Sequence, residues 1–245
     1  MVGSCHTANV QVIDAAEVTR RLAWPDLLDA IAARLGAPTD ADAPPRWILP
    51  AGDTLDAELN VLVMPAWSRD GIVGVKLVNH VPGNADRGIA TIQASYVAFS
   101  ATTGEPLAVL DGDVLTARRT AALSALAARH LARPDAARMV LVGTGQLAVP
   151  LIEAHRSIGH ARHVEVWGRS SAKAAAVVEA VDDAEVVDDL AAAVQRADLV
   201  VTATAAADPL VFRRDVRPGT HVSLIGSYQP SMSEADTELI TAATV

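Results

Sequence analysis

The sequence predicts a mixed α/β protein built from an α+β domain over residues 1–112 and a doubly wound parallel α/β domain over residues 113–245. Three observations support this prediction. Several short apolar runs separated by turn residues precede position 113, which is typical of neighbouring strands. Apolar strands and alanine-rich helices alternate after it. The chain of 245 residues is 51% hydrophobic, so it has enough apolar surface for a sizeable core and is not dominated by disorder.

In the first domain, one helix precedes a series of strands. Pro25 suits the first turn of a helix that continues with leucine and isoleucine at helical spacing and ends at Gly36. A polar, proline-containing loop follows over residues 39–45. We then expect strands at 47–49, 59–65, 72–78, 89–99 (a strand pair or one long bent strand) and 107–110, with a turn at 103–106.

The second domain begins with a long helix. Residues 114–131 are rich in alanine, the residue with the highest helix propensity. After Arg133-Pro134 the sequence predicts strands at 139–142, 164–167, 186–187, 199–202 and 222–225, with helices at 146–157, 171–181 and 189–196. Such alternation predicts a parallel sheet with helices on both faces.

Composition excludes several classes of protein. The net charge is -9, and no basic stripe suggests binding to nucleic acid or to an anionic membrane. Cys5 is the single cysteine, which excludes an internal disulfide framework and a thiolate zinc site. No run of about 18 apolar residues predicts a membrane span, and the N-terminus lacks the pattern of a secretory signal, so we expect a cytoplasmic protein without a metal.

A glycine-rich turn is the strongest local signal. Gly143, Thr144, Gly145, Gln146, Leu147 and Ala148 form a G-x-G-x-x-A motif directly after an expected strand and at the start of an expected helix. In this context the first glycine allows a tight turn, the second lets a pyrophosphate approach the backbone, and helix amides face the phosphates. The motif predicts a dinucleotide site; the alternative is a tight turn in another doubly wound fold.

The end of the next strand favours NADP(H) over NAD(H). An NAD site usually has an acidic residue there, which binds the ribose 2′-hydroxyl. This chain instead has Trp167-Gly168-Arg169-Ser170-Ser171, where Arg169 with two hydroxyls suits a 2′-phosphate. NAD(H) remains possible, because Arg169 could simply be a solvated surface residue.

Two cations occupy apolar surroundings. The sequence has 18 arginines but only the lysines Lys76 and Lys173. Lys76 lies in a run that is apolar on both faces, so we expect it to be partly buried beside an anion, unless it reaches water from an edge strand. Arg119 interrupts an expected apolar stripe through Leu115, Leu123 and Leu126, with Arg118 pointing elsewhere. Arg119 is either a carboxylate-binding group or the partner of Asp111 or Asp113 in an ion pair.

Other candidates are weaker. Arg46 follows Pro44-Pro45 and could be a simple loop residue. His80 follows the Lys76 strand and is a possible lining residue. His155, His160 and His163 straddle a helix, a turn and a strand start, so the spacing predicts no metal site and no Ser-His-Asp arrangement.

Taken together, these segments resemble the ornithine cyclodeaminase/μ-crystallin family from about Pro44 to the C-terminus. The resemblance rests on residues 44–46, 74–79, 82–84, 103–108 and 115–122, on the glycine motif, and on 202–204. It implies a Rossmann domain joined to an α+β domain that binds substrate and forms a homodimer. It also implies that the substrate is a small imino acid.

The resemblance assigns roles to individual residues. Arg46, Lys76 and Arg119 match the cations that hold the substrate α-carboxylate, and Lys76 is the candidate catalytic residue. Thr91 matches a position near the nicotinamide. Thr202, Ala203, Thr204 and Ser227 resemble further contacts of the cofactor.

Two departures from the family pattern matter. The cyclodeaminases carry a catalytic aspartate where this chain has Tyr228, and a phenol with a pKa near 10 cannot replace a carboxylate as a base at neutral pH. The sequence also stops at Val245, before the segment that usually completes the Rossmann domain. Either the chain is truncated or this member of the family is unusual.

The first departure favours the ketimine reductase branch. We expect reduction of Δ1-pyrroline-2-carboxylate or Δ1-piperideine-2-carboxylate by NADPH, giving proline or pipecolate. The alternatives are an alanine-dehydrogenase-like enzyme, an ornithine cyclodeaminase and a non-catalytic NADP(H)-binding protein. We expect no nucleic acid and no membrane as a partner.

Overall fold

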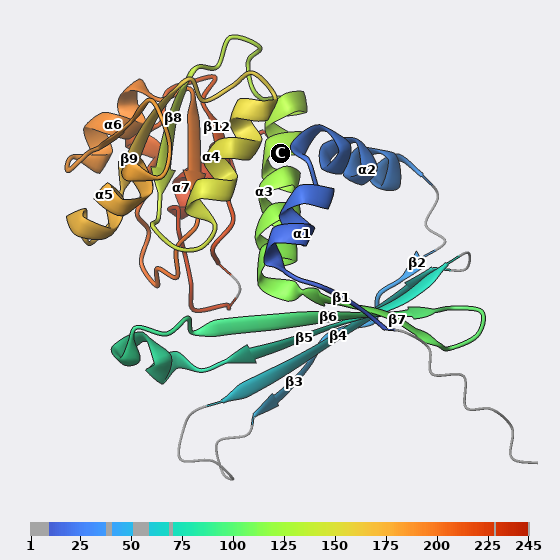
Figure 1. Cartoon of the computed structure of the whole chain (residues 1–245). Helices are drawn as coiled ribbons and strands as arrows, with labels where there is room; N and C mark the ends of the chain where they lie inside the picture. Colours follow the sequence, from blue (N-terminus) through green and yellow to red (C-terminus); the bar gives the residue numbers. More distant parts are fainter. Residues whose placement is uncertain (1–9, 38–40, 51–58, 69–70, 228, 245) are drawn as a thin grey trace, which may run out of the picture. The chain divides into compact units, whose positions relative to one another are not determined.

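A computed structural model describes residues 10–37, 41–50, 59–68, 71–227 and 229–244. The chain divides into two compact units (Figure 1). The first comprises Met1–Ala23 and Ala33–Thr116, and the second comprises Trp24–Ala32 and Ala117–Val245. The sequence-based boundary at 112/113 thus lies at the start of a helix that continues into the second unit. Trp24–Ala32, from the first long helix, belong to the second unit. The sequence did not indicate this assignment.

The first unit is built on a seven-stranded sheet with the order β1-β7-β6-β5-β4-β2, in which β3 also pairs with β4. Only β1 runs parallel to its neighbour β7, and the other pairs are antiparallel. Its strands are β1 (Gln11–Ile13), β2 (Ala41–Asp42), β3 (Trp47–Pro50), β4 (Asn60–Ser68), β5 (Ile72–His80), β6 (Ile92–Ser100) and β7 (Pro106–Asp111).

Most of this unit was predicted. β3 to β7 confirm the five expected strands, and β6 is one strand that begins at Ile92 rather than a pair beginning at Ile89. A 3-10 helix, η2 (Pro82–Arg87), fills the connection between β5 and β6. The short elements β1, β2 and α1 (Ala15–Arg21) were missed. The N-cap of α1 is clear, because the Asp14 side chain accepts the Glu17 amide at 2.9 Å.

The side chains of this sheet divide between two faces, and apolar side chains occur on both. Cross-strand register places one set of apolar side chains together, and we call these the apolar sheet face. They are Trp47, Leu49, Val61, Val63, Pro65, Trp67, Val73, Val75, Leu77, Val97, Phe99 and Val109. The polar residues Asn79 and Ser95 lie on the same face. Trp47 is 61% exposed and Leu77 is 40% exposed. The opposite face, which we call the lysine face, carries Lys76 together with Met64 and Tyr96.

The second unit confirms the predicted doubly wound sheet. Its five strands are all parallel in the order β10-β9-β8-β11-β12. They are β8 (Arg138–Val142), β9 (His163–Trp167), β10 (Ala184–Val186), β11 (Leu199–Thr202) and β12 (His221–Leu224). The helices are α2 (Trp24–Gly36), α3 (Gly112–Leu131), α4 (Ala148–Ser157), α5 (Ser171–Glu179), α6 (Leu190–Arg196) and α7 (Thr237–Ala242), with the 3-10 helix η3 (Arg213–Asp215). Only α7 and η3 lack a sequence prediction.

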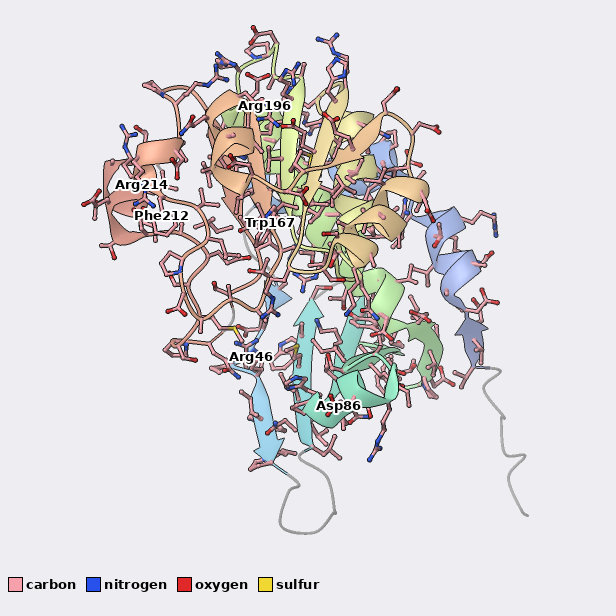
Figure 2. All side chains as sticks on the ribbon, turned by 90° about the vertical axis from the view of Figure 1, so that its left-hand side faces the viewer. Arg46, Asp86, Trp167, Arg196, Phe212 and Arg214 are labelled. Carbon is pink, nitrogen blue, oxygen red and sulfur yellow. The ribbon has the colours of Figure 1, made fainter. Side chains whose placement is uncertain are left out.

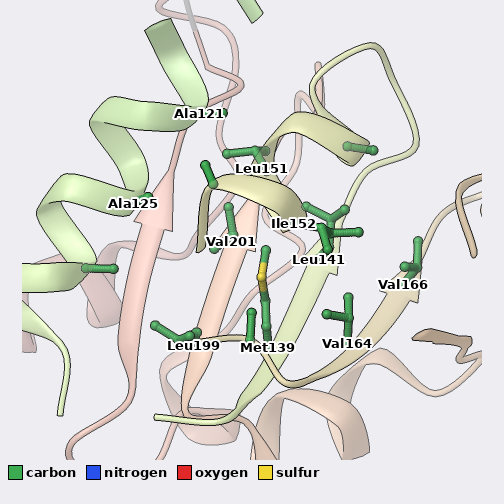
Figure 3. Packing of buried hydrophobic residues seen from close by; sticks show 14 of the residues in the cluster. Ala121, Ala125, Met139, Leu141, Leu151, Ile152, Val164, Val166, Leu199 and Val201 are labelled. Carbon is green, nitrogen blue, oxygen red and sulfur yellow. The ribbon is translucent and has the colours of Figure 1, made fainter. Parts of the chain in front are cut away.

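Helices cover both faces of the parallel sheet because alternate strand residues point to opposite sides. Met139 and Leu141 of β8 pack against buried residues of α3 and α4, including Ala125 and Leu151 (Figure 3). Val140 and Val142 pack on the other side with residues of α6 and α7. The carboxyl ends of the strands are thereby left for loops, which is where doubly wound sheets bind ligands.

The predicted apolar stripe on α3 is confirmed only at Leu126, which is 4% exposed and belongs to the core. Arg119 and Leu123 are exposed, whereas Arg118 is only 7% exposed. The Arg118 guanidinium lies 3.9 Å from the centroid of the Trp24 ring and 4.0 Å from Glu153 Oε2. The buried face of α3 is therefore the one that carries Ala121, Ala122 and Ala125. Because alanine is frequent along the whole helix, the sequence does not distinguish this face from the others.

Candidate functional site

A cleft lies at the carboxyl ends of β8, β9 and β11. It has a volume of about 620 Å³ and lies within the second unit. Six of the predicted cofactor residues line it, namely Gly143, Thr144, Arg169, Ser170, Ala203 and Thr204. The predicted residues Gly145, Gln146, Leu147, Thr202 and Ser227 are not among its lining residues.

The glycine turn has the local structure that its motif predicts. Gly143 has a φ of +130°, and a Cβ there would lie 2.5 Å from the Ala203 carbonyl oxygen. At Gly145, by contrast, a Cβ would meet no atom within 4 Å. Gly143 is therefore required by close backbone packing. Gly145 leaves open space beside the backbone, which a bound phosphate group needs.

The helix after this turn adds to the fit. α4 begins at Ala148, and among the described residues no side chain caps its N-terminus, because the N-cap residue is Leu147. The first amides of a helix carry partial positive charge and favour an anion. The turn, the open space at Gly145 and this helix end together fit a dinucleotide pyrophosphate.

The end of β9 supplies positive charge to the same cleft. Trp167, the last residue of β9 (Figure 2), is followed by Gly168, Arg169 and Ser170, all of which line the cleft. Lys173, in the first turn of α5, lines it too. Lys173 was not predicted as a site residue, although its rarity as one of two lysines was an available signal. No acidic side chain follows β9 at this point, and Asp208 is the one carboxylate among the described lining residues.

Lys76 lies in the first unit on the central strand β5, which β4 and β6 flank on both sides. The edge-strand alternative is therefore wrong. Its Nζ donates to Thr116 Oγ1 at 3.5 Å, and the residue is half-buried. The opposing residue on β6 is Tyr96, whose phenol lies against the backbone of Gly74: a Cβ at Gly74 would be 1.7 Å from Tyr96 Oη. Burial raises the pKa of Tyr96.

Arg46 immediately precedes β3, a strand of the sheet that also carries Lys76. β3 pairs with β4 through Trp47 and Val63, and the next residue of β4, Met64, pairs with Lys76 of β5. Two strand spacings separate β3 from β5 by about 10 Å, a span that two long cationic side chains can bridge around one small anion. Arg46 is exposed and lies one residue before β3 (Figure 2).

The remaining predicted residues belong to other elements. Thr91 precedes β6 and is five residues from Tyr96, about 17 Å along an extended strand. Its carbonyl oxygen accepts the Val81 amide at 2.8 Å. Arg119 is an exposed residue of α3. The Asp111 carboxylate accepts the Val114 amide at 2.8 Å and caps that helix. Tyr228, on which the departure from the cyclodeaminases rests, lies outside the described residues.

The described residues contain neither a metal-binding cluster nor a membrane-spanning helix. Among the described residues, no group of three or more histidine, cysteine or acidic side chains could hold a metal ion. In the same part of the chain, no helix has the length and apolar character needed to cross a bilayer.

The parallel five-stranded unit, with its glycine turn and cationic cleft, has the architecture of the Rossmann-type dehydrogenases. Over residues 9–245 the chain matches the model of the ornithine cyclodeaminase/mu-crystallin family. The chain belongs to this family, as its sequence motifs predicted.

Relatives in the family carry reductase names. A Delta(1)-pyrroline-2-carboxylate reductase of Paracoccus denitrificans is 34% identical over 95% of this chain and 73% of its own length. The ketimine reductase mu-crystallin of Rattus norvegicus is 34% identical over 74% of this chain and 58% of its own length. The chain thus spans about three fifths to three quarters of these relatives.

Solved structures agree on the fold. An archaeal alanine dehydrogenase dimer with bound NAD superposes with a TM-score of 0.83 at 31% identity, covering 96% of this chain and 72% of that one. The Delta(1)-pyrroline-2-carboxylate reductase of Thermococcus litoralis, in complex with NADH and L-proline, gives a TM-score of 0.84 at 23% identity and covers 94% of this chain and 73% of that one.

Proposed function

We propose that this protein is an oxidoreductase that reduces cyclic ketimines, Δ1-pyrroline-2-carboxylate or Δ1-piperideine-2-carboxylate, with NADPH. The observation that carries the proposal is Lys76, a half-buried cation on the central strand β5 of a sheet in which β3 directly follows Arg46. A half-buried ammonium is a suitable donor for a substrate carboxylate, because hydrogen bonds between two charged groups are strong. Relatives named for this activity, at 34% identity, support the proposal.

In the proposed site, protein groups position the substrate. Arg46 and Lys76 bind its carboxylate, and Arg119, which the family resemblance assigns, is the third cation. Holding the carboxylate in this way fixes the adjacent C=N carbon, so the role of the protein is mainly positioning and electrostatics. When bound, the reduced nicotinamide supplies hydride to that carbon. The Lys76 ammonium is the proposed proton donor to the imine nitrogen.

The cofactor proposed is NADP(H). Arg169 and Lys173 both line the cleft beyond β9, and no carboxylate follows that strand. A 2′-phosphate fits two cations, whereas a ribose hydroxyl prefers an acidic acceptor. The glycine turn and the first turn of α4 would hold the pyrophosphate, and Thr91, Thr202 and Ser227 stay as further predicted contacts.

We also propose a homodimer formed through the apolar sheet face. That face presents twelve apolar positions, and exposed patches of this kind commonly mark subunit interfaces. A second copy of the chain is the proposed partner, because the alanine dehydrogenase with the same fold is described as a dimer.

The test follows NADPH absorbance with each cyclic ketimine. Oxidation of NADPH above the blank, with proline or pipecolate as product, is the expected result. No oxidation with either ketimine rejects the proposed activity. Ammonia release from ornithine with NAD would instead indicate a cyclodeaminase, and dinucleotide binding without turnover a non-catalytic binding protein.

One second candidate has a specific observation in its favour. The archaeal alanine dehydrogenase is 31% identical to this chain. Pyruvate with ammonia therefore belongs beside the ketimines in the same assay. Faster turnover of pyruvate with ammonia would favour an alanine-dehydrogenase-like activity.

A further inference from the structure

Glu234 is a buried carboxylate that no sequence motif singled out. It is 2% exposed, and it follows β12 in the segment that leads to α7. Its main chain is also fixed, because its carbonyl oxygen accepts the Leu210 amide at 3.1 Å and the Val211 amide at 3.0 Å. A carboxylate that is buried this deeply needs hydrogen-bond partners, because acidic side chains are rarely fully buried without them.

The carboxylate joins two loops. Its Oε1 accepts the Thr204 amide at 2.6 Å and the Thr204 hydroxyl at 2.8 Å. Its Oε2 accepts the Gly226 amide at 2.7 Å. Thr204 follows β11 and Gly226 follows β12, so one side chain connects the carboxyl ends of two adjacent parallel strands.

One of these loops forms a wall of the cofactor cleft. Ala203 and Thr204 line the cleft, and the Ala203 carbonyl oxygen is the atom that leaves no room for a Cβ at Gly143. On the other side, a Cβ at Gly226 would lie 1.9 Å from the Thr204 carbonyl oxygen and 2.6 Å from Glu234 Oε1. The Thr204 backbone is thus held between the glycine turn and the Glu234–Gly226 pair.

We propose that Glu234 is a positioning residue of the dinucleotide site: it fixes the loops after β11 and β12 and so sets the shape of the cleft before the cofactor binds. The inference rests on the proposed dinucleotide binding and adds a residue to that site. A carboxylate is required because all three groups facing it are donors. A glutamine would turn a donating NH2 group toward one of them.

The first experiment compares Glu234→Gln with Glu165→Gln. Glu165 is a matched control: it is 3% exposed in the same unit, accepts from the Arg196 guanidinium (Figure 2) at 2.8 Å, and does not line the cleft. NADPH affinity is measured by fluorescence titration, and thermal stability is measured without cofactor. We expect E234Q to weaken NADPH binding by roughly tenfold or more, since hydrogen bonds to charged groups are the strong ones. E165Q should lose stability while keeping the wild-type affinity.

The outcomes separate the two proposals. If the wild-type chain binds no nicotinamide dinucleotide, the proposed function fails. If the wild type binds NADPH and E234Q binds it equally well at a comparable loss of stability, the role of Glu234 is purely structural and the inference is overturned.

A second measurement needs no variant and covers the case in which E234Q does not fold. Amide hydrogen exchange of the wild-type chain without cofactor should show slow exchange at Thr204 and Gly226, because both amides are bonded to Glu234 before any ligand arrives. Exchange at both amides as fast as in an open loop would contradict preorganisation by Glu234.

Discussion

At the scale of single residues, the two lysines lie in the two regions to which the proposed function assigns roles. Lys76 occupies the lysine face of the antiparallel sheet, and Lys173 lines the cleft of the parallel sheet. The sequence indicated Lys76 because an ammonium in an apolar strand is costly. It did not indicate Lys173, because the rarity of lysine was the only signal there and the residues around this lysine do not make its charge costly.

Replacing Lys76 by methionine should damage catalysis without affecting the cofactor. The substitution removes the ammonium and keeps an apolar chain of similar length. We expect kcat/KM for the ketimine to fall roughly ten- to a hundredfold, the value of a charged hydrogen bond, while the Kd for NADPH stays unchanged. Steady-state kinetics and fluorescence titration measure the two quantities. An unchanged kcat/KM would remove Lys76 from the proposed site.

Cofactor selectivity should depend on Arg169 and Lys173 together. Arg169→Ala and Lys173→Met each remove a cation from the cleft, and we expect each to weaken NADPH binding by roughly tenfold while leaving NADH binding almost unchanged. The ratio of the two Kd values is the measurement. Equal losses for NADPH and NADH would mean that these side chains do not face the 2′-phosphate.

At the scale of elements, the glycine turn could be predicted and the contacts that hold it could not. The motif follows from strand, turn and helix signals that are adjacent in the sequence. Glu234, however, is 30 positions after Thr204 in the sequence, and no periodic pattern predicts that the two residues are in contact. The stripe on α3 was largely wrong for a related reason: alanine occurs on every side of this helix, so sequence alone could not choose between Arg118 and Arg119.

The two glycines of the turn should respond differently to alanine. Gly143→Ala places a Cβ 2.5 Å from a carbonyl oxygen at a positive φ, so we expect a loss of about 1–3 kcal/mol in the free energy of unfolding as well as weaker NADPH binding. Gly145→Ala meets no atom, so stability should hold while NADPH binding falls. Denaturant unfolding and titration measure both effects. Wild-type NADPH affinity in Gly145→Ala would argue against a phosphate beside this residue.

At the scale of the whole molecule, alternation of strands and helices was sufficient to predict the parallel sheet, because each strand and its covering helix are neighbours in sequence. The antiparallel strands were predicted as elements, but their order and faces came only from the structure. Register decides which side chains share a face, and a shift of one residue would exchange the lysine face and the apolar sheet face.

The apolar sheet face should control association. Leu77→Glu places a charge in its centre, and we expect the dimer to dissociate, because an unpaired charge in an apolar interface is costly. Leu131→Glu, at an exposed leucine of the other unit, is the control and should leave the mass in solution unchanged. Light scattering after size-exclusion chromatography gives that mass. A wild-type chain that is already monomeric would refute the proposed interface.

Stability should fall in mild acid because of buried histidines. His155 is fully buried, and burial lowers its pKa to about 4; burial also lowers the pKa values of His160 and His221. The folded state therefore favours the neutral rings, whereas the unfolded chain takes up protons near pH 6.5. Stability is complete above about pH 6.5 and declines toward pH 4, by at most about 1.4 kcal/mol per pH unit for each histidine.

Denaturant unfolding between pH 7 and pH 5 measures this slope. His155→Met removes one titrating ring, so its stability should change less with pH than that of the wild type. His130, an exposed histidine at the end of α3, provides the matched control as His130→Met. A slope that is the same in all three proteins would exclude His155 as its source.

The scarcity of lysine makes this chain unusually simple to probe by chemical labelling. Lys76 and Lys173 are its two lysines, so an amine-selective acylating reagent has only these side chains and the α-amino group to modify. Mass spectrometry of two peptides would then report occupancy of both proposed sites in the native protein. Shielding of Lys173 by dinucleotide and of Lys76 by imino acid would be recorded separately, in one sample and without any mutation.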